Sequence, residues 1–258
     1  MKISSEFFNI TLLITHYNRS NSLQRLLQSF QQKGFIFGDV VVSDDGSKEA
    51  HINAIKKLQE TFSFRLLTSE KNRGLGNNIN KGQRAVTTPF TLYVQEDFVP
   101  KEPFRDALSI ALNRLQEQPE LDMARFYAYF RYPYLNPEGN GFSEMIFKPL
   151  YAGYKKFYMY SDHPHLRRSN FLEKFGNYPE GIKGDATEYR MMMNFLQQKG
   201  RGIFYEDFKG LFDQVNSETE PSTMTRNSLR NSDAVLITFA RNMYRHLKFN
   251  FDYHFKKT

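Results

Sequence analysis

Two neighbouring carboxylates, Glu96 and Asp97, stand where a predicted buried strand ends, in the stretch "TLYVQEDFVP". Like charges in contact repel each other, and an acid is costly to bury unless a cation or a hydrogen-bond donor pairs with it. The pair therefore indicates either a bound cation or a solvated turn. Because successive side chains of a strand point to opposite faces, we expect one acid, Asp97, to bind a metal unless the chain bends there.

Polar residues also follow the other predicted strands of the first hundred residues. The apolar run "ITLLIT" is followed by "HYNR", "DVVVS" by "DDGS", and "FRLL" by the loop "NRGLGNN". Because ligands of a parallel α/β sheet bind at the carboxyl ends of its strands, these polar segments are expected to converge on one rim. On its own, "DDGS" is equally compatible with an ordinary turn closed by an Asx hydrogen bond.

Strand and helix patterns alternate along the first half of the chain. Apolar runs predict strands, and apolar residues at helical spacing predict helices, the first of them capped by Ser20 or Asn21. This alternation predicts right-handed crossovers and an α/β fold, with a mostly parallel, Rossmann-like sheet flanked by helices. The predicted strands are residues 10–15, 39–47, 64–70 and 90–97, and the predicted helices lie within residues 20–34, 48–62 and 72–86.

The second half of the chain is less regular. The residues before the last helix are rich in Ser, Thr and Asn and predict a mobile loop over 216–232, and a basic helix is expected from about Asp233. The other expected elements are a helix over 104–118, an aromatic strand over 123–135, a turn-rich loop over 136–141, a strand, turn and short helix over 155–176, a helix over 183–200 and a strand over 201–208.

Composition excludes several classes of protein. Because the chain has no cysteine, disulfides, cysteine zinc sites and thiol nucleophiles are excluded. Neither a signal peptide nor an apolar stretch long enough to span a membrane is expected, which predicts a cytoplasmic protein. The net charge of +7 favours an anionic partner, but basic residues cluster only towards the C-terminus, so nucleic acid is not expected as the partner.

Four short motifs in chain order resemble those of the family 2 glycosyltransferases, which have the GT-A fold. The resemblance covers residues 10–98 and, more loosely, residues 166–196. It rests on a Thr-x-Tyr-Asn-Arg turn, an Asp-Asp-Gly-Ser turn, an Asn-x-Gly loop and an acidic motif after the fourth strand, here at 15–19, 44–47, 72–78 and 95–97. The chain departs from the family at Gln95, where an acid usually begins the metal motif.

The resemblance implies a division of the chain and a role for each motif. Residues 1–100 would form the nucleotide-sugar-binding half, 101–215 the acceptor-binding and catalytic half of the same domain, and 216–258 the mobile loop and basic C-terminal helix. Asp45 would read the donor base, and Asp97 would bind Mn²⁺ or Mg²⁺. The expected donor-binding residues are Thr15, Tyr17, Asn18, Arg19, Asp44 (in a more structural role), Asp45, Arg73, Gly74, Asn78 and Glu96.

An inverting sugar transfer needs a general base that accepts the proton of the acceptor hydroxyl. In the family, an acid at the start of a helix has this role, and the matching segment "GIKGDATEYR" offers Asp185 and Glu188 on one helix face. Asp185 is the first choice, but if it caps the helix, Glu188 completes a capping box and the roles are exchanged. His163, His165 and Arg168 are expected to face the acceptor or the diphosphate, unless their segment is a solvated polar turn.

The function implied by the resemblance is a metal-dependent, inverting glycosyltransferase. It would move a sugar from a nucleotide-diphosphate donor to a saccharide or lipid-linked saccharide, as in surface polysaccharide assembly. A nucleotidyltransferase is one alternative, and a non-catalytic nucleotide- or sugar-binding module, which Gln95 and Gly184 keep open, is another. The basic, aromatic C-terminus predicts either a peripheral contact with the inner face of the membrane or a helix that packs its apolar face on the domain.

Overall fold

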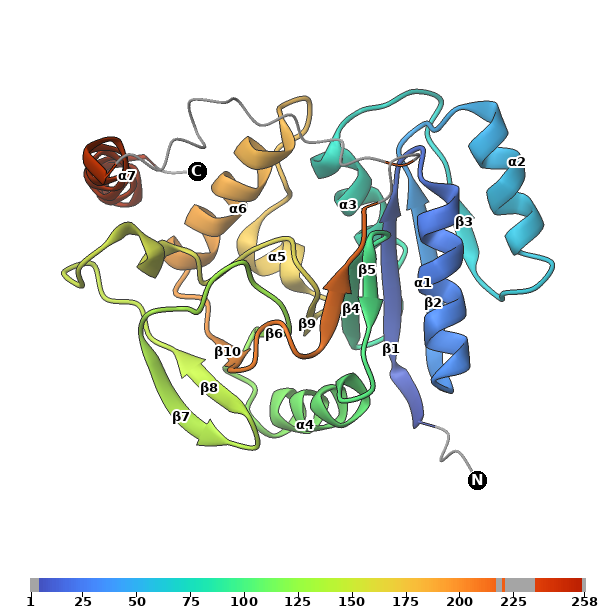
Figure 1. The fold of residues 1–258 in the computed structure, drawn as a ribbon, viewed down its shortest axis with the longest axis horizontal. Coiled ribbons are helices and arrows are strands. Elements are labelled where there is room, and N and C mark those ends of the chain that lie inside the picture. Colours follow the sequence, from blue (N-terminus) through green and yellow to red (C-terminus); the bar gives the residue numbers. More distant parts are fainter. Residues whose placement is uncertain (1–4, 217–219, 221–234, 257–258) are drawn as a thin grey trace.

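The computed structural model describes residues 5–216, 220 and 235–256, and a nine-stranded sheet runs through this part of the chain. Its strand order is β3-β2-β1-β4-β9-β6-β10-β8-β7. β8 and β9 are antiparallel to the other seven strands, which all run in one direction. A small second sheet pairs β11 with β5. The predicted α/β fold, with a mostly parallel sheet flanked by helices and a smaller mixed region, is confirmed (Figure 1).

The first half of the chain builds the parallel strands. β1 (Ser5–His16) lies between β2 (Phe35–Asp44) and β4 (Phe90–Gln95), and β3 (Arg65–Leu67) forms the edge. The crossover helices are α1 (Ser20–Gln32), α2 (Glu49–Leu58) and α3 (Leu75–Arg84). Because these strands are parallel, the carboxyl ends of β1, β2 and β4 lie at one edge of the sheet.

The second half adds strands of both directions. β9 (His165–Arg168) joins the two halves, since it pairs with β4 on one side and with β6 (Met123–Arg125) on the other. The remaining elements, in chain order, are β5 (Phe98–Pro100), α4 (Phe104–Glu117), β7 (Leu135–Gly139), β8 (Phe142–Met145), the 3-10 helix η1 (Tyr154–Phe157), α5 (Phe171–Phe175), α6 (Gly184–Gln197), β10 (Gly202–Tyr205), β11 (Phe212–Gln214) and α7 (Val235–Phe255).

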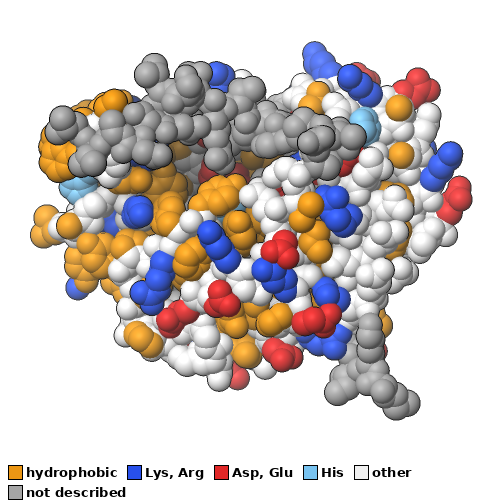
Figure 2. Space-filling model, in the orientation of Figure 1, with side chains coloured by type: hydrophobic (Ala, Val, Ile, Leu, Met, Phe, Trp, Pro, Cys, Tyr) orange, Lys and Arg blue, Asp and Glu red, His pale blue; other side chains and the backbone are white. Residues whose placement is uncertain are grey.

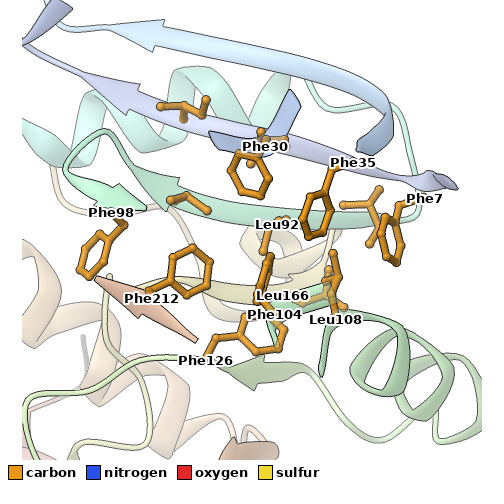
Figure 3. Packing of buried hydrophobic residues seen from close by; sticks show 14 of the residues in the cluster. Phe7, Phe30, Phe35, Leu92, Phe98, Phe104, Leu108, Phe126, Leu166 and Phe212 are labelled. Atoms are coloured by element: carbon orange, nitrogen blue, oxygen red, sulfur yellow. The ribbon is translucent and has the colours of Figure 1, made fainter. Parts of the chain in front are cut away.

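Two hydrophobic cores cover the two faces of the sheet. Leu12 and Ile14 of β1 belong to the core shared with α1, α2 and α4, whereas Leu13 belongs to the core shared with α3, α5 and α6, as the alternation of a strand requires. In the first core the rings of Phe30 and Phe104 meet edge to face (Figure 3). Burial on both faces explains why the central strands read as uninterrupted apolar runs.

Three predictions of local structure are wrong. Residues 136–141 form most of β7 and the turn of the β7–β8 hairpin rather than a loop, with Gly139, Asn140 and Gly141 at positive φ. In the aromatic segment 123–135, which was predicted to be a strand, only β6 and the first residue of β7 are strand. The strand expected from residue 155 is also absent, and the 3-10 helix η1 lies there instead. Phe126, Tyr127 and Tyr132 are buried outside any strand, so burial rather than strand pairing accounts for the apolar pattern.

The start of α1 also differs from the prediction. Neither Ser20 nor Asn21 is the cap, since the helix already begins at Ser20. Instead, the carboxylate of Glu220 accepts hydrogen bonds from the amides of Asn21 (2.9 Å) and Ser22 (2.8 Å). An acid at this helix end satisfies backbone donors that have no partner within the helix.

The predicted C-terminal helix is present as α7, which packs beside α6 and η1 (Figure 1). The predicted mobile loop over 216–232 lies outside the described residues, apart from Asn216 and Glu220. Within the described part of the chain, none of the helices is both long enough and apolar enough to cross a bilayer.

Candidate active site

A cleft of about 480 Å³ opens at the carboxyl ends of β1, β2 and β4. The first half of the chain contributes the strand ends and the loop before α3, and the second half contributes the segment before β9 and the first turn of α6. The lining residues are Thr15, His16, Tyr17, Arg19, Asp45, Asn72, Gly74, Leu75, Asn78, Gln95, Glu96, Asp97, Tyr129, Asp162, His163, Ile182, Lys183, Gly184, Glu188 and Gln214. The polar strand ends thus converge on one rim, as predicted.

The turn after β1 is held by a buried imidazole–carboxylate pair. His16 Nδ1 lies 2.7 Å from Asp44 Oδ1, and His16 Nε2 accepts the amide N–H of Arg19 at 3.0 Å, so Nδ1 carries the proton that is donated to Asp44. Burial would raise the pKa of Asp44, but hydrogen bonds from His16 and Ser47 outweigh this and lower it. Asp44 joins the ends of β1 and β2 and lies outside the cleft lining.

Asn18 likewise connects two turns. It adopts a left-handed conformation with φ of 54°, which its short polar side chain tolerates. The backbone N–H of Asn18 donates to Ser47 Oγ at 2.7 Å, and its side-chain Oδ1 accepts the backbone N–H of Lys48 at 2.8 Å. The side chain of Asn18 is therefore engaged with the second turn and does not line the cleft.

Asp45 holds the loop in front of α3. Its two carboxylate oxygens accept the amide N–H groups of Arg73 and Gly74, each at 2.9 Å. Gly74 has φ of +89°, which a residue with a side chain rarely adopts. Burial raises the pKa of Asp45. Asp45 and Gly74 line the cleft, whereas the side chain of Arg73 is exposed and outside the lining.

Thr15, Tyr17 and Asn78 complete this wall. The hydroxyl of Thr15 lies 3.0 Å from that of Tyr93, and Asn78 Nδ2 donates to the backbone oxygen of His16 at 3.2 Å. These contacts tie the end of β1 to β4 and α3. Tyr17 is half-buried, with part of its surface open to the cleft.

The two acids of the opening motif point to the same side. β4 ends at Gln95, and the chain turns at Glu96 and Asp97 before β5 begins, so strand alternation does not separate them. Arg19 Nη1 lies 3.6 Å from Glu96 Oε1 and 3.5 Å from Asp97 Oδ2. One arginine therefore faces both carboxylates.

This acid pair keeps negative charge and an unused oxygen in the cleft. Burial and the charge of Asp97 raise the pKa of Glu96 to about 7. Asp97 Oδ2 accepts a hydrogen bond from Gln214 at 2.9 Å. Asp97 Oδ1 and Arg19 Nε are buried and find no hydrogen-bond partner among the described residues. Because Asp97 and Arg19 both line the cleft, these two atoms are available to a ligand bound there.

Two residues of this wall were not foreseen from the sequence. Gln214 reaches Asp97 because β11 pairs with β5, and its Oε1 accepts the hydroxyl of Tyr129 at 3.1 Å. Both side chains line the cleft. Because the short strand β11 lies more than a hundred residues after Asp97, no local pattern connects them.

A second pair of carboxyl groups, Asp162 and Glu188, lies in the cleft wall contributed by the second half. Glu188 Oε1 accepts the amide N–H of Asp162 at 3.1 Å, and Asp162 Oδ1 accepts the hydroxyl of Tyr160 at 2.5 Å. Burial raises the pKa of both acids, and the charge of Glu188 raises that of Asp162 further. Asp162 was not predicted as a site residue from the sequence.

The two candidate bases have different surroundings. Glu188 is half-buried and lines the cleft, whereas Asp185 is exposed and outside the lining. α6 begins at Gly184, with Lys183 in the cap position, so the capping box in which Asp185 would be the cap is not formed.

Of the three basic residues expected near the acceptor, His163 lines the cleft. Burial and the charge of Arg125 lower the pKa of His163 to about 3, so its imidazole is neutral at pH 7. His163 Nδ1 lies 2.7 Å from Ser161 Oγ. His165 is fully buried, with its ring centre 5.3 Å from that of Tyr93.

The structure does not bring Arg168 to the cleft. Its guanidinium donates to the backbone oxygens of Leu121 at 2.8 Å and Gln118 at 3.0 Å, just after α4. The neighbouring Arg167 points to the opposite face of β9, where it is buried against Gln83. Strand alternation and the antiparallel direction of β9 explain why neither arginine reaches the rim.

The strand-end acids limit what kind of metal site is possible. Within the described residues, there is no group of three or more His, Asp or Glu side chains that could hold a metal. Asp97, with its free Oδ1, and Glu96 are the acids at the end of β4. This set fits Mg²⁺ or Mn²⁺ that takes most of its ligands from water and phosphate, and it does not fit a closed protein cage.

Known proteins similar in sequence are glycosyltransferases. Residues 11–177 match the family described as glycosyl transferase family 2. The chain is 22% identical over 116 residues to poly-beta-1,6-N-acetyl-D-glucosamine synthase of Staphylococcus aureus (strain MSSA476), and 21% identical over 124 residues to cholesterol galactosyltransferase of Borreliella burgdorferi. These matches cover 45% and 48% of this chain but 27% and 34% of the relatives, so the chain spans about a third of their length or less.

Solved structures share the fold. The crystal structure of S. aureus TarS 1–349 with UDP-GlcNAc has a TM-score of 0.62 at 18% identity and covers 96% of this chain and 76% of that one. Mannosyltransferase PcManGT from Pyrobaculum calidifontis, with GDP-Man and Mn²⁺, has a TM-score of 0.55 at 17% identity. This match covers 78% of this chain and 55% of the mannosyltransferase chain. Since the family match extends over more than half of the chain, this protein has the expected GT-A fold and belongs to glycosyl transferase family 2.

Proposed function

We propose that this chain transfers a sugar from a nucleoside diphosphate donor to an acceptor hydroxyl, with inversion at the anomeric carbon and with the help of a divalent cation. The observation that carries the proposal is the cleft itself, where the acids Glu96 and Asp97 share one space with Asp45 and with the carboxyl group of Glu188. Two proteins of the same fold bind UDP-GlcNAc and GDP-Man, which supports a nucleotide-sugar donor.

The donor base would lie between the ends of β1 and β2. Tyr17 offers a partly open ring against which a flat base can pack. Asp45 already accepts two amide hydrogen bonds, and a carboxylate has lone pairs left for an N–H of the base. Because Arg73 is exposed on the loop in front of α3, it can approach the base or phosphates from the solvent side.

The diphosphate would lie against Asp97 through a divalent cation. A bound Mg²⁺ or Mn²⁺ supplies positive charge that stabilises the leaving diphosphate. Asp97 Oδ1 is the oxygen available to hold it, because Oδ2 is engaged by Gln214. Arg19 already neutralises part of the negative charge of this pair, and its guanidinium is close enough to Asp97 to contact a phosphate as well.

Glu188 is the base that the cleft geometry favours. Its raised pKa gives the carboxylate a higher affinity for a proton than an exposed acid has. In the proposed step, Glu188 accepts the proton of the acceptor hydroxyl as that oxygen bonds to the anomeric carbon. The bond from this carbon to the phosphate oxygen breaks, and the nucleoside diphosphate leaves with the electron pair. We propose a saccharide or lipid-linked saccharide as the acceptor.

A thermal-shift screen of nucleotide sugars, with and without Mn²⁺, tests this function. A donor at about 100 times its dissociation constant stabilises the folded state by about 2.7 kcal/mol, which raises the melting temperature by roughly 5 °C. We expect such a shift for one class of nucleotide sugar, larger with Mn²⁺ than without. No shift with any nucleotide sugar would contradict the proposal, and a larger shift with a nucleoside triphosphate would favour a nucleotidyltransferase.

A further inference from the structure

One face of α7 fixes this helix to the rest of the molecule. Phe249 is buried in the second core, with its ring centre 5.6 Å from that of Phe157 and 4.9 Å from that of Tyr189. The carboxylate of Asp252 accepts the hydroxyl of Tyr189 at 2.6 Å, and Gln197 of α6 donates to backbone oxygens near the end of α7. The orientation of α7 about its own axis is therefore set.

The opposite face of α7 is apolar and open to solvent. Met243, Leu247, Phe251 and Phe255 recur every fourth residue, and Tyr244 lies beside them on the same side of the helix. Their exposed fractions range from 51% for Met243 to 74% for Phe255. We call this set the α7 stripe. Figure 2 shows hydrophobic side chains gathered at the end of the molecule where Figure 1 draws α7.

A neighbouring loop extends this apolar surface. Leu150 is 99% exposed, although a leucine gains free energy from burial. Its loop lies next to α7, because the amine of the buried Lys156 donates to the backbone oxygens of Pro149 and Tyr151 and also reaches Asn250 of α7 at 3.3 Å. Exposed apolar side chains that gather in one region of a surface mark an interaction site.

Positive charge lies along one flank of the α7 stripe, between the stripe and the face that fixes the helix. The described part of α7 carries Arg241, Arg245, Lys248 and Lys256, and its one acid within these residues, Asp252, is buried and paired with both lysines. The loop adds the exposed Lys148 and Lys155. A second copy of this chain would bring the same positive border and a net charge of +7 to the contact, which like-charge repulsion disfavours. An anionic lipid surface matches both the apolar stripe and its border.

We propose that the α7 stripe and Leu150 dock this protein on an anionic membrane surface. The apolar side chains would enter the boundary between head groups and acyl chains, and the bordering arginines and lysines would lie at the level of the lipid phosphates. The helix would lie in the plane of the interface rather than cross the bilayer. This inference does not rest on sugar transfer and holds for any donor that the cleft takes.

Vesicle co-sedimentation of the full chain tests the proposal. The vesicles are phosphatidylcholine alone and phosphatidylcholine with about 30 mol% phosphatidylglycerol. We expect at least about tenfold stronger binding to the anionic vesicles, and at least about a tenfold loss of that binding in the double variant Leu247→Glu/Phe251→Glu. The matched control Phe8→Glu/Ile36→Glu changes two exposed apolar residues of β1 and β2 and is expected to bind like the wild type.

Two results of the vesicle assay would overturn the proposal. One is wild-type binding without a preference for anionic vesicles, and the other is undiminished binding by the double variant. The uncharged variant Leu247→Ser/Phe251→Ser repeats the test if the glutamates unfold the helix, which circular dichroism would reveal. Sedimentation velocity without lipid is expected to show a monomer. A dimer that the double variant dissociates would assign the α7 stripe to a second copy and overturn the membrane proposal.

Discussion

The acid pair at the end of β4 predicts a specific effect of pH on stability, which the substitution Glu96→Gln reveals. Burial and Asp97 raise the pKa of Glu96 from 4.5 to about 7. At about 1.36 kcal/mol per pKa unit, ionising Glu96 in the folded state costs about 3 kcal/mol of unfolding free energy. Glutamine has nearly the same shape and no charge, so the variant does not incur this cost.

The sign follows from which state holds the proton. Below pH 4.5, Glu96 is neutral in both states and carries no penalty. Between pH 4.5 and about 7, the unfolded chain releases this proton while the folded protein keeps it, so the unfolding free energy of the wild type falls as pH rises. Above about pH 7, Glu96 is ionised in both states, and the penalty stays constant.

Urea unfolding in steps from about pH 5 to about pH 8 measures the effect. We expect the stability of Glu96→Gln relative to the wild type to increase across this range, by up to about 3 kcal/mol. Taking the difference cancels the contributions of Asp162 and Glu188, which both proteins share. The exposed control Glu60→Gln is expected to differ from the wild type by less than about 0.5 kcal/mol throughout. A difference for Glu96→Gln that does not change with pH would refute the reasoning.

Three further predictions concern the base and the frame of the cleft. Glu188→Gln is expected to lower turnover about 10²- to 10⁴-fold while donor affinity is kept, whereas Asp185→Asn is expected to lower turnover by less than about tenfold. Turnover is measured by the release of nucleoside diphosphate, and equal losses in the two variants would contradict the assignment of Glu188 as the base. Asp44→Asn is expected to lower the unfolding free energy by about 2 kcal/mol at neutral pH. The difference in stability between wild type and variant should become smaller as pH falls through the lowered pKa of Asp44, and a difference that does not change with pH would contradict this prediction. Gly76→Ala would set a Cβ 2.2 Å from Pro179 O, so we expect a loss of about 2 kcal/mol, and an unchanged melting temperature would disprove this contact.

Local patterns were sufficient for the first half of the fold. The central strands are buried on both faces, so their sequences are apolar without interruption, and each is followed by polar residues that have to leave the core. These strand ends put Asp45, Glu96 and Asp97 on one rim, as the sequence predicted. The direction of Glu96 could not be predicted, because it depends on the bend that begins β5.

Contacts between distant segments account for what the sequence did not reveal. Gln214 meets Asp97 through the β11–β5 pairing, and Glu220 closes the start of α1 in place of a local cap. Asp185 and Glu188 stand three residues apart on one helix, and only the position of α6 against the sheet shows which of them lines the cleft. Arg168 lies in a sequence that suggests phosphate binding, but β9 runs against β4 and turns it towards α4.

We propose above all that Asp97 holds a divalent cation for a nucleoside diphosphate in this cleft. The most direct test is calorimetric titration of the nucleotide selected by the donor screen, with and without Mn²⁺, into the wild type and Asp97→Asn. Asp213→Asn is the matched control, because Asp213 precedes Gln214 on β11 and pairs with Lys101 outside the cleft lining.

We predict that Mn²⁺ strengthens nucleotide binding by about 10- to 100-fold in the wild type and in Asp213→Asn, and that this gain is absent in Asp97→Asn. The same affinity and the same metal dependence in Asp97→Asn as in the wild type would contradict the account.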